Sequence, residues 1–227
     1  MNLSLPVLFI NFKTYSESTG KNAIVLAEKA QKIADEERAS IVLVVQVVDI
    51  EAVSKTVKLP VFAQHIDPVS FGSNTGHILP EAVKEAGVVG TVLNHAENKR
   101  DNAFIEKAIG RAKELGLIVM VCAEDIERAK QIASFVQKPD LIAVEPPELI
   151  GGDVSVSTAN PELITDSVNA VKEIAPEIEV ITGAGIKNNS DVKKALELGT
   201  KGVFVASGII KADNQESAIK DLVEGFK

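Results

Sequence analysis

The feature that most constrains the fold of this chain is a regular alternation of short apolar runs with longer amphipathic segments. The runs are rich in Val and Ile and are apolar on both faces, which is typical of strands in a buried parallel sheet. We predict strands at residues 7–12, 40–46, 60–64, 90–94, 117–122, 141–145, 180–183 and 202–206. The segments between them have charged and apolar faces, and predict helices at residues 20–37, 48–57, 80–85, 102–115, 125–136, 161–174, 190–198 and 215–226.

Eight strand–helix units close naturally into a barrel, so the predicted fold class is α/β and the predicted architecture is a (β/α)8 barrel. A chain of 227 residues suits one such barrel, and no Gly/Ser linker divides it, so we expect a single domain over residues 1–227. A doubly wound open sheet is the alternative. Its glycine fingerprint G-x-G-x-x-G is missing after the first predicted strand.

The charge and the apolar content exclude several classes of partner. The net charge of -8 comes from 32 acidic and 24 basic side chains without long blocks of like charge, which argues against nucleic acid and anionic membrane surfaces. The sequence has no apolar span of about 18 residues and does not begin like a secretory signal, so we expect neither a membrane segment nor export, and predict a cytoplasmic enzyme.

Polar side chains stand at the ends of several of the apolar runs. Asn11 and Lys13 close the first run, His95 and Glu97 follow the fourth, and Glu145 closes the sixth. Polar and charged side chains are costly to bury, so their presence at the ends of buried strands suggests that they interact with something outside the sheet. Because the ends of all strands meet at one face of a barrel, these residues predict an active site there.

The chemistry of this face can be inferred from the residue types. Glu145 precedes two prolines and then the glycine pair Gly151-Gly152, a pattern that indicates a base beside a hinged lid. Lys13 and the backbone amides of Gly151, Gly185, Ser207 and Gly208 are suited to an anion such as phosphate, and His95 is a candidate electrophile or acid.

The remaining candidates have simpler interpretations. Cys122 is the only cysteine and lies in an apolar run, so we predict a buried structural thiol. We expect His65 and His77 to be structural or exposed, and no metal site, because no Cys/His/Asp spacing for zinc occurs. We expect Glu124 and Glu148 to be solvated or ion-paired.

Four segments together carry a resemblance to a known family. The chain resembles triosephosphate isomerase, in particular its shorter archaeal form, in Asn11-Phe12-Lys13, Asn94-His95-Ala96-Glu97, Ala143-Val144-Glu145-Pro146-Pro147-Glu148-Leu149-Ile150-Gly151 and Gly183-Ala184-Gly185-Ile186. The resemblance runs from about residue 7 to residue 222. It implies a TIM barrel that interconverts dihydroxyacetone phosphate and D-glyceraldehyde 3-phosphate through an enediolate, without cofactor or metal.

The resemblance also implies roles for individual residues. Glu145 would abstract the proton next to the carbonyl, and His95 would polarise the carbonyl oxygen, a base and a neutral electrophile that are well known for this family. Lys13 would supply positive charge to the phosphate and the enediolate, Asn11 would orient the substrate, and Glu97 would lie close to the lysine.

The resemblance also implies a phosphate site and contacts between subunits. The lid at residues 150–153, with Ile150 and Gly151, together with Gly185, Ala206 and Ser207, would hold the phosphate and exclude water. Thr75, in a loop at residues 72–76, would insert beside a neighbouring subunit, so a homo-oligomer, a dimer or a tetramer, is implied.

Departures from the family pattern in two segments leave a second hypothesis open. Ala96 stands where the family has serine, and Gly152-Asp153 replace the Thr-Gly of the lid. The alternative to a working isomerase is therefore a catalytically impaired barrel that binds a small phosphate ester without turnover. Another sugar-phosphate isomerase on the same barrel is a third hypothesis, which the pairing of His95 with Glu145 disfavours.

Overall fold

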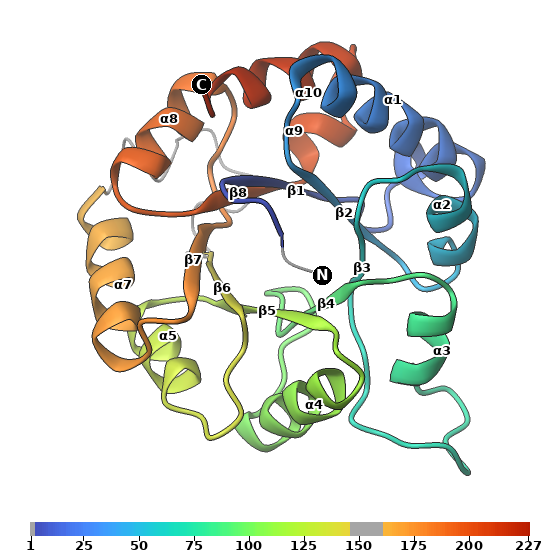
Figure 1. Cartoon of the computed structure of the whole chain (residues 1–227), viewed down its shortest axis with the longest axis vertical. Helices are drawn as coiled ribbons and strands as arrows, with labels where there is room; N and C mark the ends of the chain where they lie inside the picture. Colours follow the sequence, from blue (N-terminus) through green and yellow to red (C-terminus); the bar gives the residue numbers. More distant parts are fainter. Residues whose placement is uncertain (1–2, 146–160) are drawn as a thin grey trace.

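Eight parallel strands form a closed barrel that a ring of helices surrounds (Figure 1). The computed structural model describes residues 3–145 and 161–227. The strands follow one another around the barrel in chain order, and β1 pairs with both β2 and β8, which closes the ring. The predicted (β/α)8 barrel is therefore confirmed, and the open sheet is excluded.

The predicted strands and helices all occur, with ends that shift by only a few residues. The strands are β1 (Val7–Asn11), β2 (Ile41–Val45), β3 (Val61–Ala63), β4 (Gly90–Leu93), β5 (Ile118–Ala123), β6 (Leu141–Val144), β7 (Glu179–Thr182) and β8 (Gly202–Val205). The main helices are α1 (Lys21–Glu37), α2 (Ile50–Thr56), α3 (Pro80–Glu85), α4 (Asn102–Glu114), α5 (Ile126–Ala133), α7 (Pro161–Ile174), α8 (Asn189–Glu197) and α10 (Gln215–Glu224).

Two short helical turns were not predicted from the sequence. A 3-10 turn, η1 (Ser16–Ser18), follows β1, and α9 (Ser207–Ile210) follows β8. Each spans about one turn, which is too short to show helical periodicity in a sequence. Both lie in loops at the carboxyl ends of strands, so the omission concerns the face that carries the predicted site.

The apolar character of both strand faces is explained by two separate cores. Alternate residues point inward, and those inside the barrel include Phe9, Phe62, Phe204 and Met120. Phe9 packs edge-on against Phe62 and Phe204, with ring centroids 5.6 and 6.3 Å apart. The other residues of each strand face the helices and form the larger outer core. The barrel is thus filled with side chains, and its interior supports the loops above it.

Side-chain caps fix the starts of four helices that follow strands of the barrel. Asp101, Asp125, Asn188 and Asn214 each accept a hydrogen bond from a backbone N–H in the first turn of α4, α5, α8 and α10, at 2.7 to 3.1 Å. Such caps commonly stabilise a helix by about 1 kcal/mol. They also set where each loop ends, because the capping residue is the last one outside the helix.

In the part of the chain that the structure describes, no helix has the length and apolar character that crossing a membrane requires.

Glycine at position 90, the first residue of β4, is required by the packing between strands. A Cβ atom there would lie 2.4 Å from the buried Phe62 ring and 2.6 Å from the carbonyl oxygen of Ile118. We expect Gly90→Ala to lower the free energy of unfolding by about 1–3 kcal/mol, the usual cost of overpacking a core. Denaturant-induced unfolding measures this change.

Gly110→Ala is the matched control for this substitution. Gly110 lies inside α4, where a Cβ atom would meet only Gln137 Cγ at 3.8 Å. Alanine is the better helix former there, so we expect a gain of about 0.5–1 kcal/mol. Equal stability changes in the two variants would refute the steric explanation for Gly90.

Candidate active site

A cavity of about 520 Å³ opens at the face where the carboxyl ends of the strands meet. Its wall comes from segments that follow five different strands, which is how barrels of this kind assemble a site. The described lining residues are Asn11, Lys13, Tyr15, His95, Glu97, Glu145 and residues 183–187 and 204–208.

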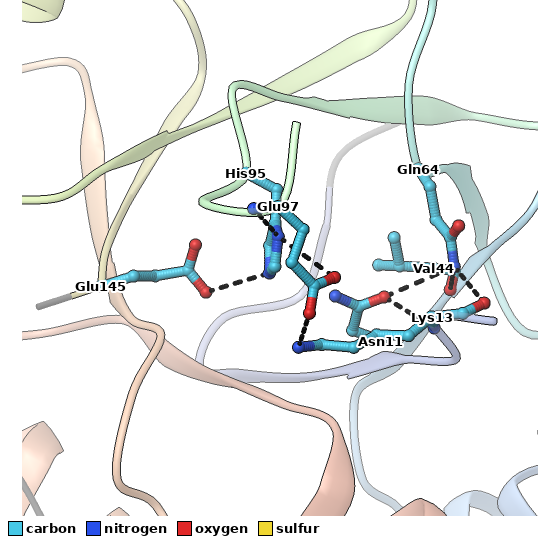
Figure 2. Close-up of polar contacts among 7 residues, drawn as sticks. All are labelled: Asn11, Lys13, Val44, Gln64, His95, Glu97 and Glu145. Carbon is cyan, nitrogen blue, oxygen red and sulfur yellow. Dashed lines mark hydrogen bonds and ion pairs between the residues drawn. The ribbon is translucent and has the colours of Figure 1, made fainter. Parts of the chain in front are cut away.

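His95 is held as a neutral imidazole with one nitrogen directed at Glu145 (Figure 2). The backbone N–H of Glu97 donates to His95 Nδ1 at 3.1 Å, so Nδ1 carries no proton and the ring proton is assigned to Nε2. His95 Nε2 lies 3.7 Å from Glu145 Oε1. Burial and then the charge of Lys13 lower the pKa of His95 to about 4. The site therefore presents an uncharged N–H donor near neutral pH.

Glu145 is a buried carboxyl group with little solvation. It follows β6 directly, its backbone N–H donates to Ala123 O at 2.8 Å, and the residue is only 3% exposed. Within residues 3–145 and 161–227, its Oε2 atom finds no hydrogen-bond partner. Burial raises the pKa of Glu145 to about 7, although a hydrogen bond from the Cys122 thiol lowers it. A carboxylate with such a pKa is a stronger base than one in water.

Gly183 leaves the space that the Glu145 side chain occupies. A Cβ atom at Gly183 would lie 2.3 Å from Glu145 Cγ. The turn after β7 thus packs directly against the carboxylate that follows β6, and a larger residue at position 183 would displace it.

Lys13 forms an ion pair with Glu97 across the mouth of the cavity. Lys13 Nζ lies 2.7 Å from Glu97 Oε1, and the Lys13 side chain is 12% exposed (Figure 2). Its backbone has a φ of +47°, a left-handed conformation that lysine seldom adopts. The backbone N–H donates to Asn11 Oδ1 at 3.0 Å, and the carbonyl accepts from Gln64 Nε2 at 2.9 Å.

Asn94 shapes the loop that carries His95 and Glu97. Its own φ is +59°, which asparagine tolerates better than most residues. Asn94 Nδ2 donates to Cys122 O on the neighbouring strand β5, and Asn94 Oδ1 accepts from the backbone N–H of Arg100, both at 2.9 Å. Asn94 thereby ties the start of the loop to β5 and joins it to the end of the loop at Arg100.

The opposite wall of the cavity is lined with backbone donors. The N–H groups of Gly185, Ser207 and Gly208 meet no acceptor among residues 3–145 and 161–227. Gly185 has a φ of +67°, which lets the turn after β7 approach a ligand closely. Lys187 also lines this part of the cavity and adds a second lysine to it. These groups suit an anion.

The structure brings most of the sequence-predicted site residues to this one cavity. The residues that line it are Asn11, Lys13, His95, Glu97, Glu145, Gly185, Ala206 and Ser207. Ile150 and Gly151, the rest of the lid at residues 150–153, and Glu148 lie outside the described residues. Sequence reasoning missed Tyr15, Gln64 and Lys187. Gln64 does end an apolar run, the same signal that identifies Lys13, but the pattern predicts it as the last residue of the strand at 60–64.

The simpler interpretations of other residues fit their surroundings. Cys122 is buried, and His65 Nε2 lies 3.4 Å from Asp67 Oδ1 while its ring stacks on Phe104. His77 is exposed, and Glu124 pairs with Lys99 at 3.1 Å. In the described ranges, no group of three or more His, Cys, Asp or Glu residues is arranged to hold a metal ion.

Comparison with known proteins gives one consistent result. The family model of triosephosphate isomerase matches residues 6–224. Triosephosphate isomerase of Methanocaldococcus jannaschii is 46% identical over 218 residues, which cover 96% of this chain and 99% of that protein. The enzyme of Methanothermus fervidus is 44% identical over 218 residues, with 96% and 97% covered. That of Methanosarcina barkeri is 42% identical over 221 residues, with 97% and 99% covered.

The protonation state of His95 gives a direct prediction. Because the pKa of His95 is lowered to about 4, we expect its imidazole to remain neutral at pH 5.5, with the proton on Nε2. The ¹⁵N chemical shifts of the ring, followed by NMR from pH 8 to pH 5, measure this state. The same histidine in denaturant should titrate near pH 6.5. A His95 ring that gains its second proton above pH 6 in the folded protein would contradict the assignment.

Proposed function

The chain belongs to the triosephosphate isomerase family, and from this premise we infer that it interconverts dihydroxyacetone phosphate and D-glyceraldehyde 3-phosphate. The resemblance found in the sequence is thereby confirmed by the family model and by archaeal relatives that match nearly the whole chain. The observation that carries the mechanism is the pair of Glu145 and His95, a buried carboxyl group whose pKa is about 7 facing a neutral imidazole N–H at 3.7 Å.

In this mechanism Glu145 is the base. Removing a proton from carbon next to a carbonyl needs a carboxylate that is more basic than usual and close to its target. Burial supplies the basicity, and the contact with Gly183 restricts where the side chain lies. The same carboxyl group returns the proton to the neighbouring carbon, while the hydroxyl proton of the enediolate passes from one oxygen to the other. The carbonyl and the hydroxyl group of the substrate thereby exchange places, and the enzyme is unchanged.

His95 is the electrophile that stabilises the enediolate. As the proton leaves carbon, negative charge develops on the carbonyl oxygen, and a prepositioned N–H donor in a cavity stabilises that charge. The hydrogen bond from the Glu97 backbone to Nδ1 keeps the donor proton on Nε2, the nitrogen that faces Glu145. A neutral imidazole suits the forward and the reverse reaction, because it can donate a hydrogen bond to the substrate oxygen without carrying a full positive charge.

Lys13 and the backbone donors bind the phosphate. The cavity contains the carboxylates Glu97 and Glu145, and the chain has a net charge of -8, so a dianionic substrate requires local positive charge. Lys13 supplies that charge, and the amides of Gly185 and Ser207 supply directed hydrogen bonds. Loops after the last two strands commonly hold phosphate in barrels of this type.

The impaired-barrel hypothesis has no support from these observations. The archaeal relatives described above are named as the isomerase, and Asn11, Lys13, His95 and Glu145 line one cavity. Ala96 lacks the hydroxyl of the serine in the family pattern, whereas the buried position and raised pKa of Glu145 are set by the barrel itself. Closure of residues 150–153 over the substrate and a cytoplasmic location remain predictions from the sequence.

Glu145→Asp tests the proposed function most directly. The substitution keeps the carboxylate but withdraws it by one methylene, and misplacement by about 1 Å can cost 100-fold in rate. We expect kcat to fall about 100-fold or more, with a much smaller change in KM, in an assay coupled to glyceraldehyde 3-phosphate. Glu124→Asp, which shortens an ion-paired carboxylate after β5, is the control and should leave kcat unchanged. A Glu145→Asp enzyme with parental kcat would rule out Glu145 as the base.

Lys13→Met tests the role of positive charge. The substitution keeps the approximate shape of the side chain and removes the ammonium group, so activity should be abolished and the affinity for glycerol 3-phosphate should fall together. Calorimetry measures that affinity. The control is Lys32→Met, which removes the same charge from an exposed pair with Glu216. Unaltered binding of the phosphate ester to the Lys13→Met variant would count against this role.

We also propose self-association through the loop after β3. Phe71 is 77% exposed there, in a segment of small residues that includes Thr75. An exposed aromatic residue of this kind is better buried against a second copy. We expect multi-angle light scattering to give a mass above that of the 24.2 kDa chain, and Phe71→Ser to shift it towards the monomer. Leu5→Ser, before β1 at the opposite end of the barrel, should not. An active parental monomer at micromolar concentration would remove the proposal.

A further inference from the structure

The left-handed backbone of Lys13 requires an explanation in the residues around it. A lysine with a φ of +47° is strained, and such a conformation persists only where neighbouring groups hold it in place. The strain occurs two residues beyond Asn11, at the sharp turn that leaves β1. The position of the ammonium group in the cavity therefore depends on how this peptide is held.

Gln64 binds the backbone carbonyl group of Lys13 (Figure 2). It follows β3, two strands away from β1, and its Nε2 donates to Lys13 O at 2.9 Å. The same nitrogen lies 3.5 Å from Asn11 Oδ1 and 3.5 Å from Val44 O. All three neighbouring atoms are acceptors, so the amide orientation is determined by its surroundings and only the nitrogen fits there.

Asn11 binds the backbone N–H of Lys13, and its own side-chain amide is oriented by its contacts with Lys13 and Gln64. Its Oδ1 accepts from the Lys13 N–H at 3.0 Å and faces Gln64 Nε2. With Oδ1 engaged in this way, Nδ2 is the atom that Asn11 offers to the cavity that it lines. Both peptide groups of Lys13 are thus hydrogen-bonded by amide side chains from different strands.

We propose that Gln64 is a positioning residue, which keeps Lys13 in its left-handed conformation and orients Asn11 for the substrate. Gln64 lies in the wall of an adjoining hollow of about 220 Å³ and is absent from the lining of the main cavity, so it acts through Lys13 and Asn11. The proposal rests on the proposed function, because it concerns how the phosphate-binding lysine of the isomerase is placed.

The test is a double-mutant cycle between Gln64 and Lys13. Gln64→Met removes the donor and keeps the length of the side chain. We expect kcat/KM for dihydroxyacetone phosphate to fall about 10-fold to 100-fold, and the affinity for glycerol 3-phosphate to fall with it. In the Lys13→Met background, where the ammonium group is already gone, the same substitution should change that affinity by less than about 2-fold.

Gln46→Met is the matched control. Gln46 follows β2, the strand between β1 and β3, and its Nε2 donates to Thr19 Oγ1 and Asp49 Oδ2 at 3.0 and 2.9 Å, away from Lys13. The substitution is chemically identical, so it should leave kcat/KM within about 2-fold of the parent. Thermal unfolding of each variant separates a loss of folded protein from a loss of positioning.

Gln64→Glu provides a second readout if Gln64→Met does not fold. Its carboxylate cannot donate to Lys13 O, but its protonated carboxyl group can. We expect the affinity of this variant for glycerol 3-phosphate, relative to the parent at each pH, to recover as the pH is lowered from 8 to 5. Equal effects of Gln64→Met in both backgrounds, or a pH-independent ratio for Gln64→Glu, would overturn the proposal. A parental enzyme that does not isomerise dihydroxyacetone phosphate would instead overturn the proposed function.

Discussion

The hydrogen bonds between β1 and β8 are the constraint on which the rest of the molecule depends. They close eight parallel strands into a ring, so that chain segments far apart in sequence end at one face. Lys13 follows β1, His95 follows β4 and Glu145 follows β6, yet all three line one cavity. An open sheet with the same strands would spread these side chains along an edge, and no single substrate would reach them.

Much of this arrangement is predictable from the sequence, because the barrel imposes a simple pattern. Strands that are covered on both faces must be apolar throughout, so a charged residue at the end of such a run is conspicuous, as Glu145 is. The same physics explains the omissions. The apolar pattern extends the third predicted strand over Gln64, although β3 ends at Ala63, and α9 is too short to show helical periodicity. Lysine has no preference for a positive φ, so nothing in the sequence indicates the conformation of Lys13.

Uncharged amide side chains form many of the hydrogen bonds that position the charged residues of the site. Asn11 and Gln64 bind the two peptide groups of Lys13. Asn94, at the start of the loop that presents His95, binds strand β5 and the far end of that loop. An amide both donates and accepts, so it can join two backbone segments without adding to the electrostatic repulsion in a crowded site. The charges on Lys13 and Glu97 remain available to each other and to a ligand.

The burial of Glu145 and His95 shifts their pKa values, and these shifts affect both catalysis and the stability of the folded protein. Burial raises the pKa of Glu145 from 4.5 to about 7, so the folded chain binds more protons there than the unfolded chain, and this group contributes less stability as the pH rises through that window. His95, whose pKa falls from 6.5 to about 4, works in the opposite sense and costs stability as the pH drops below 6.5. Folding therefore favours an uncharged pair, whereas proton abstraction requires the carboxylate. The ionised enzyme that starts the reaction is the form that the barrel stabilises less, so a variant chosen only for resistance to unfolding would tend to lose its base.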